Sequence, residues 1–181
     1  FNSCDSIKGI PIGLFSMVKH GGYNAFEVFN TEALHVNLAY KIGVRQFYNV
    51  FTTGVQFRPA SASSQVRFAY GYGVGTSIPL SKKIAINFDN VVLHVLETNW
   101  LNRELNLLNR LNGAIGVRLG KTATLYAGPS LNVMVSSQYV DGNTEPGSNL
   151  APYSLVNETF SEGSKDVNLK IWFGYTAGIR F

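Results

Sequence analysis

The sequence predicts an all-β protein, an antiparallel β-barrel of about eight to ten strands, and three observations lead to this prediction. Apolar and polar residues alternate with a period of two along most of the chain, as they do in a strand whose two faces meet different surroundings. Helical periodicity is nearly absent. The connections between the alternating segments are short and long in turn, which is typical of a chain that runs back and forth through a barrel wall.

The composition fits one folded domain, so we treat residues 1–181 as a single unit. Charged residues make up 14% of the chain, where roughly a quarter is usual in soluble domains. No stretch approaches the ~20 consecutive apolar residues that a membrane-spanning helix needs. The single cysteine, Cys4, excludes an internal disulfide. The net charge of +4 comes without a lysine and arginine cluster, so no nucleic-acid partner is expected.

The first four strands are expected at 9–18, 23–30, 33–44 and 47–57. The third is the clearest, because apolar or aromatic side chains at even positions from Leu34 to Val44 oppose polar side chains such as Lys41. The segments 23–30 and 47–57 alternate more weakly. The first segment is the weakest, because it contains Pro11 and proline is tolerated mainly at sheet edges or strand starts.

The next three strands are expected at 65–79, 84–97 and 107–119. In the first of these, large apolar side chains at most even positions oppose Arg67 and a row of small residues. The nearly continuous apolar run 91–96 blurs the alternation of the second, which indicates a β-bulge. In the third, apolar side chains at odd positions oppose Arg110, Gly116 and Arg118.

The last two strands are expected at 122–136 and 167–181, with 138–166 as a long loop between them. The last strand is the most regular, since every odd position from Val167 to Phe181 is apolar or aromatic. These make nine segments, whereas single-chain bacterial barrels have an even number of strands. We therefore favour ten strands over eight. Because the chain begins at Phe1 without an initiator methionine, we expect upstream sequence, and sequence around or before that residue would supply the tenth strand. The alternatives are that the weak segment 9–18 is not in the wall, or that a partner completes the ring.

Alternation alone does not decide which face meets water, because a soluble barrel buries its apolar face and a membrane barrel turns it toward lipid. The polar faces here are rich in glycine, alanine, serine and threonine, unlike the charged surface of a soluble protein. The clearest segments also exceed the roughly 9 to 11 residues that cross a bilayer. The sequence therefore predicts an antiparallel transmembrane β-barrel with apolar residues outside, polar residues inside and 138–166 as a long extracellular loop.

Three stretches resemble a known class of protein. The ending KIWFGYTAGIRF resembles the final strand that bacterial outer-membrane barrels present to their assembly machinery. The stretch LNRLNGAIGVRLGKTATLYAGPSLNVMVS resembles small outer-membrane barrels of Bacteroidetes-type bacteria, and GIPIGLFSMV resembles a short repeat in surface proteins of that kind. As a pattern, the resemblance covers most of residues 34–181.

The resemblance implies a bacterial outer-membrane location and a fold, but no activity. It implies contact with outer-membrane lipid, lipopolysaccharide and the barrel-assembly machinery. It also implies that the C-terminal assembly signal consists of Phe173, Tyr175, Ile179 and Phe181.

A polar cluster is expected inside the barrel, and its members come from the faces opposite the apolar ones. At this number of strands, side chains fill the interior, so we expect a hydrogen-bonded plug. Cations outnumber acids, with Glu27 as a further inward acid, which leaves a narrow anion-preferring pore as an alternative. The predicted lumen cluster consists of Lys41, Arg45, Arg67, Asp89, Arg118, Lys170 and Arg180.

Other candidate sites carry less weight. The positions of Asp89 and His94 differ by an odd number, so regular alternation places these side chains on opposite faces. A lipid A-modifying enzyme using His94 remains an alternative. The glycines of YGYGVGTS alternate along one strand face, unlike a nucleotide-binding loop. The three histidines lack metal-ligand spacing, so no metal or cofactor is expected. We expect a non-enzymatic structural or surface subunit, in contact with other outer-membrane proteins within a larger complex.

Overall fold

The computed structural model describes residues 22–44, 46–57, 66–96, 106–120, 122–139, 150, 153–162 and 165–181. None of these residues forms a helix, and so none belongs to a helix long and apolar enough to cross a membrane. The described residues form nine strands: β1 (Tyr23–Thr31), β2 (Val36–Val44), β3 (Phe47–Gln56), β4 (Arg67–Pro79), β5 (Ile84–Leu96), β6 (Asn106–Leu119), β7 (Ala123–Tyr139), β8 (Val156–Glu162) and β9 (Lys165–Arg180).

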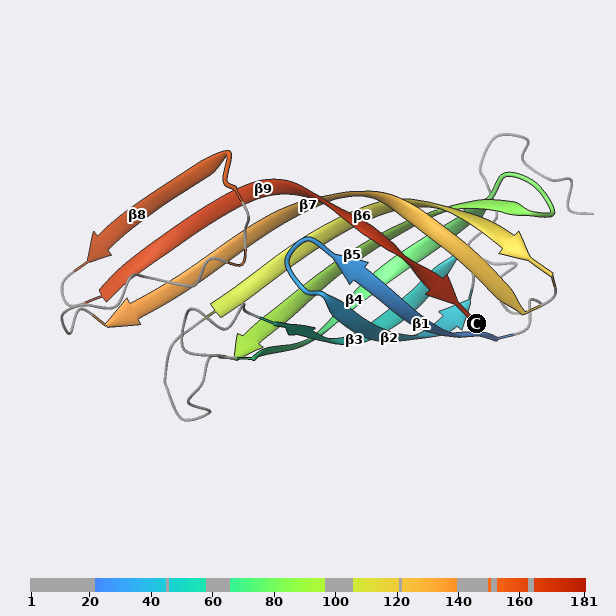
Figure 1. The fold of residues 1–181 in the computed structure, drawn as a ribbon, viewed down its shortest axis with the longest axis horizontal. Helices are drawn as coiled ribbons and strands as arrows, with labels where there is room; N and C mark the ends of the chain where they lie inside the picture. The colour runs from blue at the N-terminus through green and yellow to red at the C-terminus, as the bar shows by residue number, and fades with distance from the viewer. Residues whose placement is uncertain are drawn as a thin grey trace, which may run out of the picture.

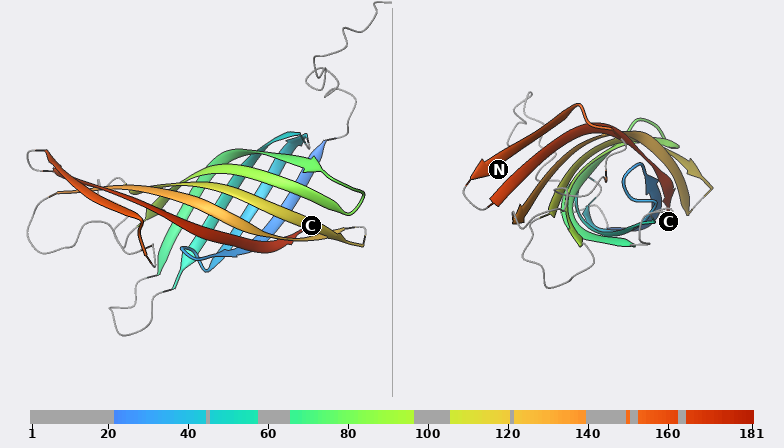
Figure 2. Two further views of the ribbon diagram at one scale, coloured as in Figure 1. Left: turned by 90° about the horizontal axis from the view of Figure 1, so that it is seen from above. Right: turned by 60° about the vertical axis from the view of Figure 1, so that its left-hand side comes forward.

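The strands form one antiparallel sheet that closes on itself (Figures 1 and 2). Consecutive strands pair from β1 to β7, β7 then pairs with β9, and β9 pairs with β1. Within the described residues, β1 to β7 and β9 therefore make a closed ring of eight strands, and β8 adds to the free edge of β9. The predicted all-β barrel of about eight to ten strands is confirmed.

The nine predicted segments and the nine observed strands are not the same set. The expected strand 9–18 lies outside the described residues, and the described ring closes with eight strands rather than the favoured ten. The region 138–166 is not loop throughout, because β8 lies inside it and pairs with β9 from Val156↔Ile171 to Glu162↔Lys165. Alternation gives little sign of β8, since its described side chains are mostly exposed on both faces.

The seam between β1 and β9 is the shortest pairing in the ring. It runs from the mutual backbone hydrogen bonds of Phe26 and Phe181 to the pair Thr31↔Thr176. Further along the same edge of β9, side chains take the place of a neighbouring strand and form hydrogen bonds with the β9 backbone. The Tyr153 hydroxyl donates to the Phe173 carbonyl oxygen at 2.6 Å, and the Tyr175 amide donates to Glu32 Oε2 at 2.8 Å. Some backbone groups on this edge of β9 therefore have hydrogen-bond partners although no strand lies beside them.

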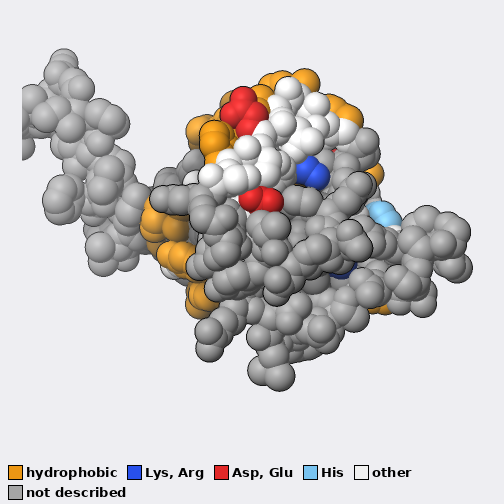
Figure 3. Space-filling model, turned by 90° about the vertical axis from the view of Figure 1, so that its left-hand side faces the viewer, with side chains coloured by type: hydrophobic (Ala, Val, Ile, Leu, Met, Phe, Trp, Pro, Cys, Tyr) orange, Lys and Arg blue, Asp and Glu red, His pale blue; other side chains and the backbone are white. Residues whose placement is uncertain are grey.

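The two faces of the sheet have the predicted residue types in the predicted places. On β4, Phe68, Tyr70 and Tyr72 point outward and are about half exposed, whereas Arg67 and Ala69 are buried inside. In the end-on view of Figure 3, hydrophobic side chains border much of the described surface. Large apolar residues therefore cover the outer face of the ring, and its buried charged residues lie inside, which inverts the arrangement of a soluble barrel.

The interior is filled by side chains and by one turn. The connection between β1 and β2 folds into the curvature of the barrel, as the right-hand view in Figure 2 shows, and buries Ala33 and Leu34 completely. Around them pack the fully buried side chains of Trp172, Tyr48, Leu93, Leu108, Met134 and Leu150. Such filling is expected of an eight-strand ring, whose lumen is only wide enough for side chains.

Candidate functional site in the barrel interior

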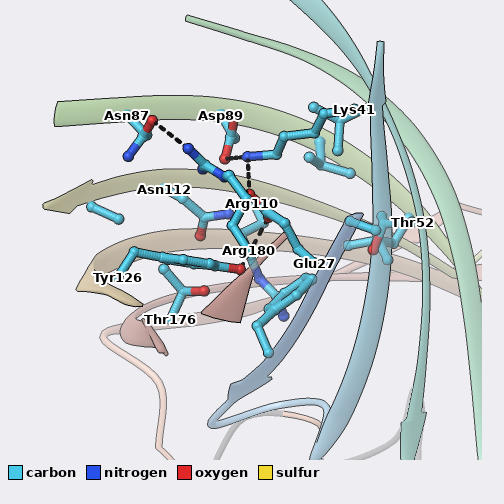
Figure 4. A pocket seen from close by; sticks show the side chains of 16 residues that line it. Glu27, Lys41, Thr52, Asn87, Asp89, Arg110, Asn112, Tyr126, Thr176 and Arg180 are labelled. Carbon is cyan, nitrogen blue, oxygen red and sulfur yellow. Dashed lines mark hydrogen bonds and ion pairs between the residues drawn. The ribbon is translucent and has the colours of Figure 1, made fainter. Parts of the chain in front are cut away.

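A network of ion pairs occupies the part of the lumen nearest the chain's C-terminus (Figure 4). The Lys41 ammonium lies 3.0 Å from Glu27 Oε1 and 2.7 Å from Asp89 Oδ2, and so joins β1, β2 and β5. Arg180 Nε donates to the same Glu27 oxygen. The alternation of β1, β2, β5 and β9 places all four side chains on the inner face, where two cations and two acids form three ion pairs.

Two tyrosine hydroxyls also donate hydrogen bonds to these carboxylates. The Tyr126 hydroxyl donates to Glu27 Oε2 at 3.0 Å, and the Tyr48 hydroxyl donates to Asp89 Oδ1 at 2.8 Å. The Lys41 ammonium also lies 5.0 Å from the centre of the Tyr48 ring, within range of a cation–π interaction. Gly75 makes room for this arrangement, because a Cβ there would collide with the Tyr48 ring and the Asp89 carboxylate.

A second group of polar contacts surrounds Glu32, which enters the lumen from the β1–β2 turn. Its carboxylate accepts hydrogen bonds from Trp172 Nε1 at 3.0 Å, Asn132 Nδ2 at 2.9 Å and the Tyr175 amide at 2.8 Å. Gly174 lies directly against it, since a Cβ at this glycine would collide with the carboxylate. Asn132 in turn accepts from Arg110 Nε at 3.1 Å, and thereby connects Arg110 to Glu32.

The charged groups of this arrangement are buried or partly buried and bound to one another. Buried charges are costly to desolvate, and they are tolerated when each is paired and hydrogen-bonded. Glu27 and Lys41 are almost completely buried, so neither group is open to a molecule outside the barrel. Both carboxylates of the first network already accept from two or three protein donors. The network therefore ties strands together across the lumen and fills it.

The structure brings only some of the predicted lumen cluster together. Lys41, Asp89 and Arg180 meet in the first network with Glu27, as expected. Arg67 is also inside and buried, but it lies apart from that network, with Nη1 donating to Gln56 Oε1 at 3.4 Å.

The remaining predicted members lie elsewhere. Lys170 is on the inward face but only partly buried. Arg118 is exposed at the end of β6, where it lines an open hollow instead of joining the buried cluster, because the strand ends there. Arg45 lies outside the described residues.

The predicted assembly signal occupies the outer face of β9. Phe173, Tyr175 and Phe181 are about half exposed, and Ile179 lies on the same face. Their recognition by assembly machinery stays a prediction. His94 also faces outward, and its ring packs edge-on against Tyr70, with centroids 5.6 Å apart, while Asp89 faces the lumen. No group of three or more histidine, cysteine or acidic residues in the described part of the chain could hold a metal ion.

Glu32 is the main site residue that sequence reasoning missed. It follows the last residue of β1, where alternation no longer predicts the direction of a side chain. Its partners Trp172 and Gly174 do stand on the polar face of the last strand, where an aromatic side chain is unusual beside small residues. An inward Trp172 followed by an inward Gly174 is the one feature of the sequence that indicates another side chain packed against β9.

Comparison with known proteins adds no further information, because no family model, no curated protein and no solved structure matches this chain significantly.

Proposed function

We propose that this chain is a transmembrane β-barrel of a bacterial outer membrane that acts as a non-enzymatic structural or surface subunit with a plugged lumen. The observation that carries the proposal is the inside-out distribution of residues around the ring. Exposed aromatic and aliphatic side chains occur on the outer face throughout the barrel, whereas Lys41, Arg110 and Glu27 are buried. Apolar surface on this scale is unfavourable in water and favourable against lipid chains.

The dimensions of the strands support a membrane location. The shortest strands of the ring, β1 and β2, have 9 residues each, and β7 has 17. Roughly 9 to 11 tilted residues cross the hydrocarbon layer, so every strand of the ring is long enough or nearly so. Short connections join β2 to β3, β4 to β5 and β6 to β7 at one end, as in the periplasmic turns of such barrels.

The filled lumen supports a structural role over conduction. A channel needs a continuous polar passage, whereas this interior contains the inserted β1–β2 turn, the Trp172 indole and the ion network of Glu27, Lys41 and Asp89. A non-enzymatic role is supported by the carboxylates, which are held by protein donors, and by the outward position of His94.

The end of the barrel that carries β8 supports a surface role. There β7, β8 and β9 continue beyond the ring as an extension of its wall (Figure 1). Leu155 and Phe160 are more than half exposed, and Glu158 is exposed beside them. Apolar side chains at the rim of a polar surface suit contact with another outer-membrane protein.

The test is to express the chain behind a cleavable export signal in a Gram-negative host and to separate the inner and outer membranes by density. We expect the protein in the outer-membrane fraction, extractable only with detergent, with β-rich circular dichroism and faster gel migration before heating than after. In a planar bilayer it should conduct no steady current. A monomer that stays in solution without detergent would overturn the proposal, and steady conductance would replace its structural role with that of a pore.

A further inference from the structure

An open hollow lies at the mouth of the barrel, at the end where short connections join β4 to β5 and β6 to β7 (right in Figure 1). It offers a space of about 560 Å³, within the roughly 300 to 1,000 Å³ of small-molecule sites. The side chains of the inserted turn and the ion network fill the lumen behind it. Its polar lining includes Lys82, Lys83, Arg118 and Arg180, with the hydroxyl-bearing Ser81 and Thr124.

The strand register places three of these cations in one row. Arg118 pairs with Thr124 and Thr124 pairs with Arg180, so the three residues stand side by side across β6, β7 and β9. On the other side of β6, the Arg118 amide donates to the Lys83 carbonyl oxygen at 2.8 Å, which continues the pairing of β5 with β6 by one residue. Lys83 therefore stands opposite Arg118, where Cβ atoms of antiparallel strands are about 4.5 to 5.5 Å apart.

The cations of the hollow are not balanced by acids. No acidic side chain lines it, and no carboxylate in the described part of the chain pairs with Lys82, Lys83 or Arg118. Arg180 belongs to the network of two cations and two acids, so three positive charges are left, and a carboxylate at the end of the chain would still leave two. Like charges directly opposite each other destabilise a sheet, and so this row favours an anionic occupant.

Hydrogen-bond donors lie at the floor and at the rim of the hollow. Beneath the floor, Asn87 Oδ1 accepts from Arg180 Nη1 at 3.0 Å, and the other end of the amide is turned toward Gly116, which lines the hollow (Figure 4). A Cβ at Gly116 would lie 3.3 Å from Asn87 Nδ2, a buried donor that finds no acceptor among the described residues. At the rim, Ser81 Oγ accepts from two backbone amides of its own turn, which leaves the hydroxyl hydrogen for another acceptor.

We propose that this hollow binds a phosphate group. A phosphate monoester carries about −1.5 to −2 charges near pH 7 and has three acceptor oxygens, which matches the two or three positive charges that the protein leaves over. The Arg118 guanidinium has the fork of N–H donors that binds two phosphate oxygens together, and Lys82 and Lys83 add point charges at the rim.

A small soluble phosphate ester suits the position of the hollow better than the headgroup of a phospholipid. Arg118 continues the inward-facing row of β6 that contains Asn112, Ala114 and Gly116, and so belongs to the mouth of the lumen and not to the outer surface. Because the lumen behind the hollow is filled, the ligand is held at the mouth and does not pass through. This inference depends on the geometry of the mouth and not on the membrane location, so each can fail without the other.

The test uses the full chain folded in a maltoside detergent, which contains no phosphate. Inorganic phosphate or glycerol phosphate is added, with sodium chloride at equal ionic strength as the control. We expect both phosphates to raise the melting temperature in a saturable manner, by on the order of 5 °C. Chloride should have a smaller effect that does not saturate, because it only screens the repulsion among the cations. Equal effects of phosphate and chloride would overturn the proposal.

Two variants assign the effect to the hollow. Arg118→Gln should raise the phosphate concentration needed for half of the effect by about tenfold, because it removes a charged donor from the bound phosphate. Since Arg118 is exposed, the variant is expected to fold. Lys170→Gln is the matched control, because it removes one positive charge from the inner face toward the other end of β9 and should leave that concentration unchanged. The same concentration in the parent and in Arg118→Gln would contradict the assignment to this hollow.

Lipid nanodiscs distinguish the two sources of the phosphate group. Glycerol phosphate is titrated into discs of phosphatidylcholine with and without phosphatidylglycerol. For a soluble ligand, the anionic lipid should not change the concentration needed for half of the effect. An increase with phosphatidylglycerol would overturn the soluble source and identify the lipid headgroup as the occupant.

Discussion

Glu27 and Arg180 stand directly opposite each other on β1 and β9, and their side chains form an ion pair inside the seam that closes the barrel. The same Glu27 carboxylate also binds the Lys41 ammonium of β2 and the Tyr126 hydroxyl of β7. One buried carboxylate therefore joins four strands around the point where the two ends of the sheet meet. Since the backbone pairing of this seam is the shortest in the ring, side-chain contacts contribute a larger share of its stability than elsewhere.

Replacing Glu27 by glutamine is expected to destabilise the barrel strongly. The change preserves the shape of the side chain but leaves Lys41 and Arg180 in the lumen with one acid, Asp89, in the first network. Removing one partner of a buried ion pair typically costs about 3 to 5 kcal/mol. Urea unfolding in detergent, followed by tryptophan fluorescence, measures the loss. Glu158→Gln is the matched control, because Glu158 is exposed on β8 and its removal should leave the midpoint unchanged.

A disulfide between Val28 and Ile179 should lock the ring. These residues are paired across the β1–β9 seam and both belong to the outer face. Paired residues in antiparallel strands have Cα atoms about 4.5 to 5.5 Å apart, which lies within the range of a disulfide. In a Cys4→Ser background, the double cysteine variant should oxidise and then migrate faster on a denaturing gel until reductant is added. The control carries Val28→Cys with Phe173→Cys, which are not paired, and should stay reduced. A disulfide in the control and none in the paired variant would mean that β1 and β9 do not pair in this register.

The ring and its inner face could be predicted from the sequence because alternation carries both kinds of information. The same period of two that located β4 and β9 also placed Lys41, Arg67, Asp89 and Arg180 on the inside, where the structure has them. The prediction was wrong for Arg118 because alternation gives the direction of a side chain but not its depth in the barrel. At the end of a strand, an inward side chain reaches solvent.

Two further features follow from contacts between distant segments and could not be predicted. The residues of β8 alternate poorly, and the strand is held by its backbone pairing with β9. Glu32 lies in a turn, and its inward position depends on Trp172, Asn132 and Gly174, all 100 or more positions along the chain.

Adding a methyl group at Gly174 should push the Glu32 carboxylate away from β9. A Cβ at this position would collide with the Glu32 carboxylate, whose bonds to Trp172 and Tyr175 would then be lost. Overpacking of this kind costs about 1 to 3 kcal/mol. In a Trp100→Phe background, Gly174→Ala should make the remaining Trp172 fluorescence more accessible to a soluble quencher.

Gly113→Ala is the control for this prediction. Gly113 lies in β6, and a Cβ there would meet only the Phe88 ring, at 3.4 Å, which is an ordinary contact. Its quenching should match that of the parent protein. If Gly174→Ala also left the quenching unchanged, the Glu32 carboxylate would not lie against Gly174 and Trp172 as the structure has it.

An arginine on the outer face of β6 separates a lipid-facing barrel from a water-facing one. Ile115 and Leu119 are both on this face, 56% and 47% exposed, and four residues apart. In water, either substitution should have a small effect, because both side chains are already exposed.

In a bilayer, Leu119 at the turn end lies near the interface, and Ile115 lies roughly 10 Å deeper, close to the middle of an apolar band of about 25 Å. Ile115→Arg should therefore cost about 2 to 4 kcal/mol and Leu119→Arg at most about 1 kcal/mol when folding is measured in phospholipid vesicles. Equal and small costs for the two variants in vesicles would contradict the membrane location, because only a lipid environment makes the penalty depend on depth.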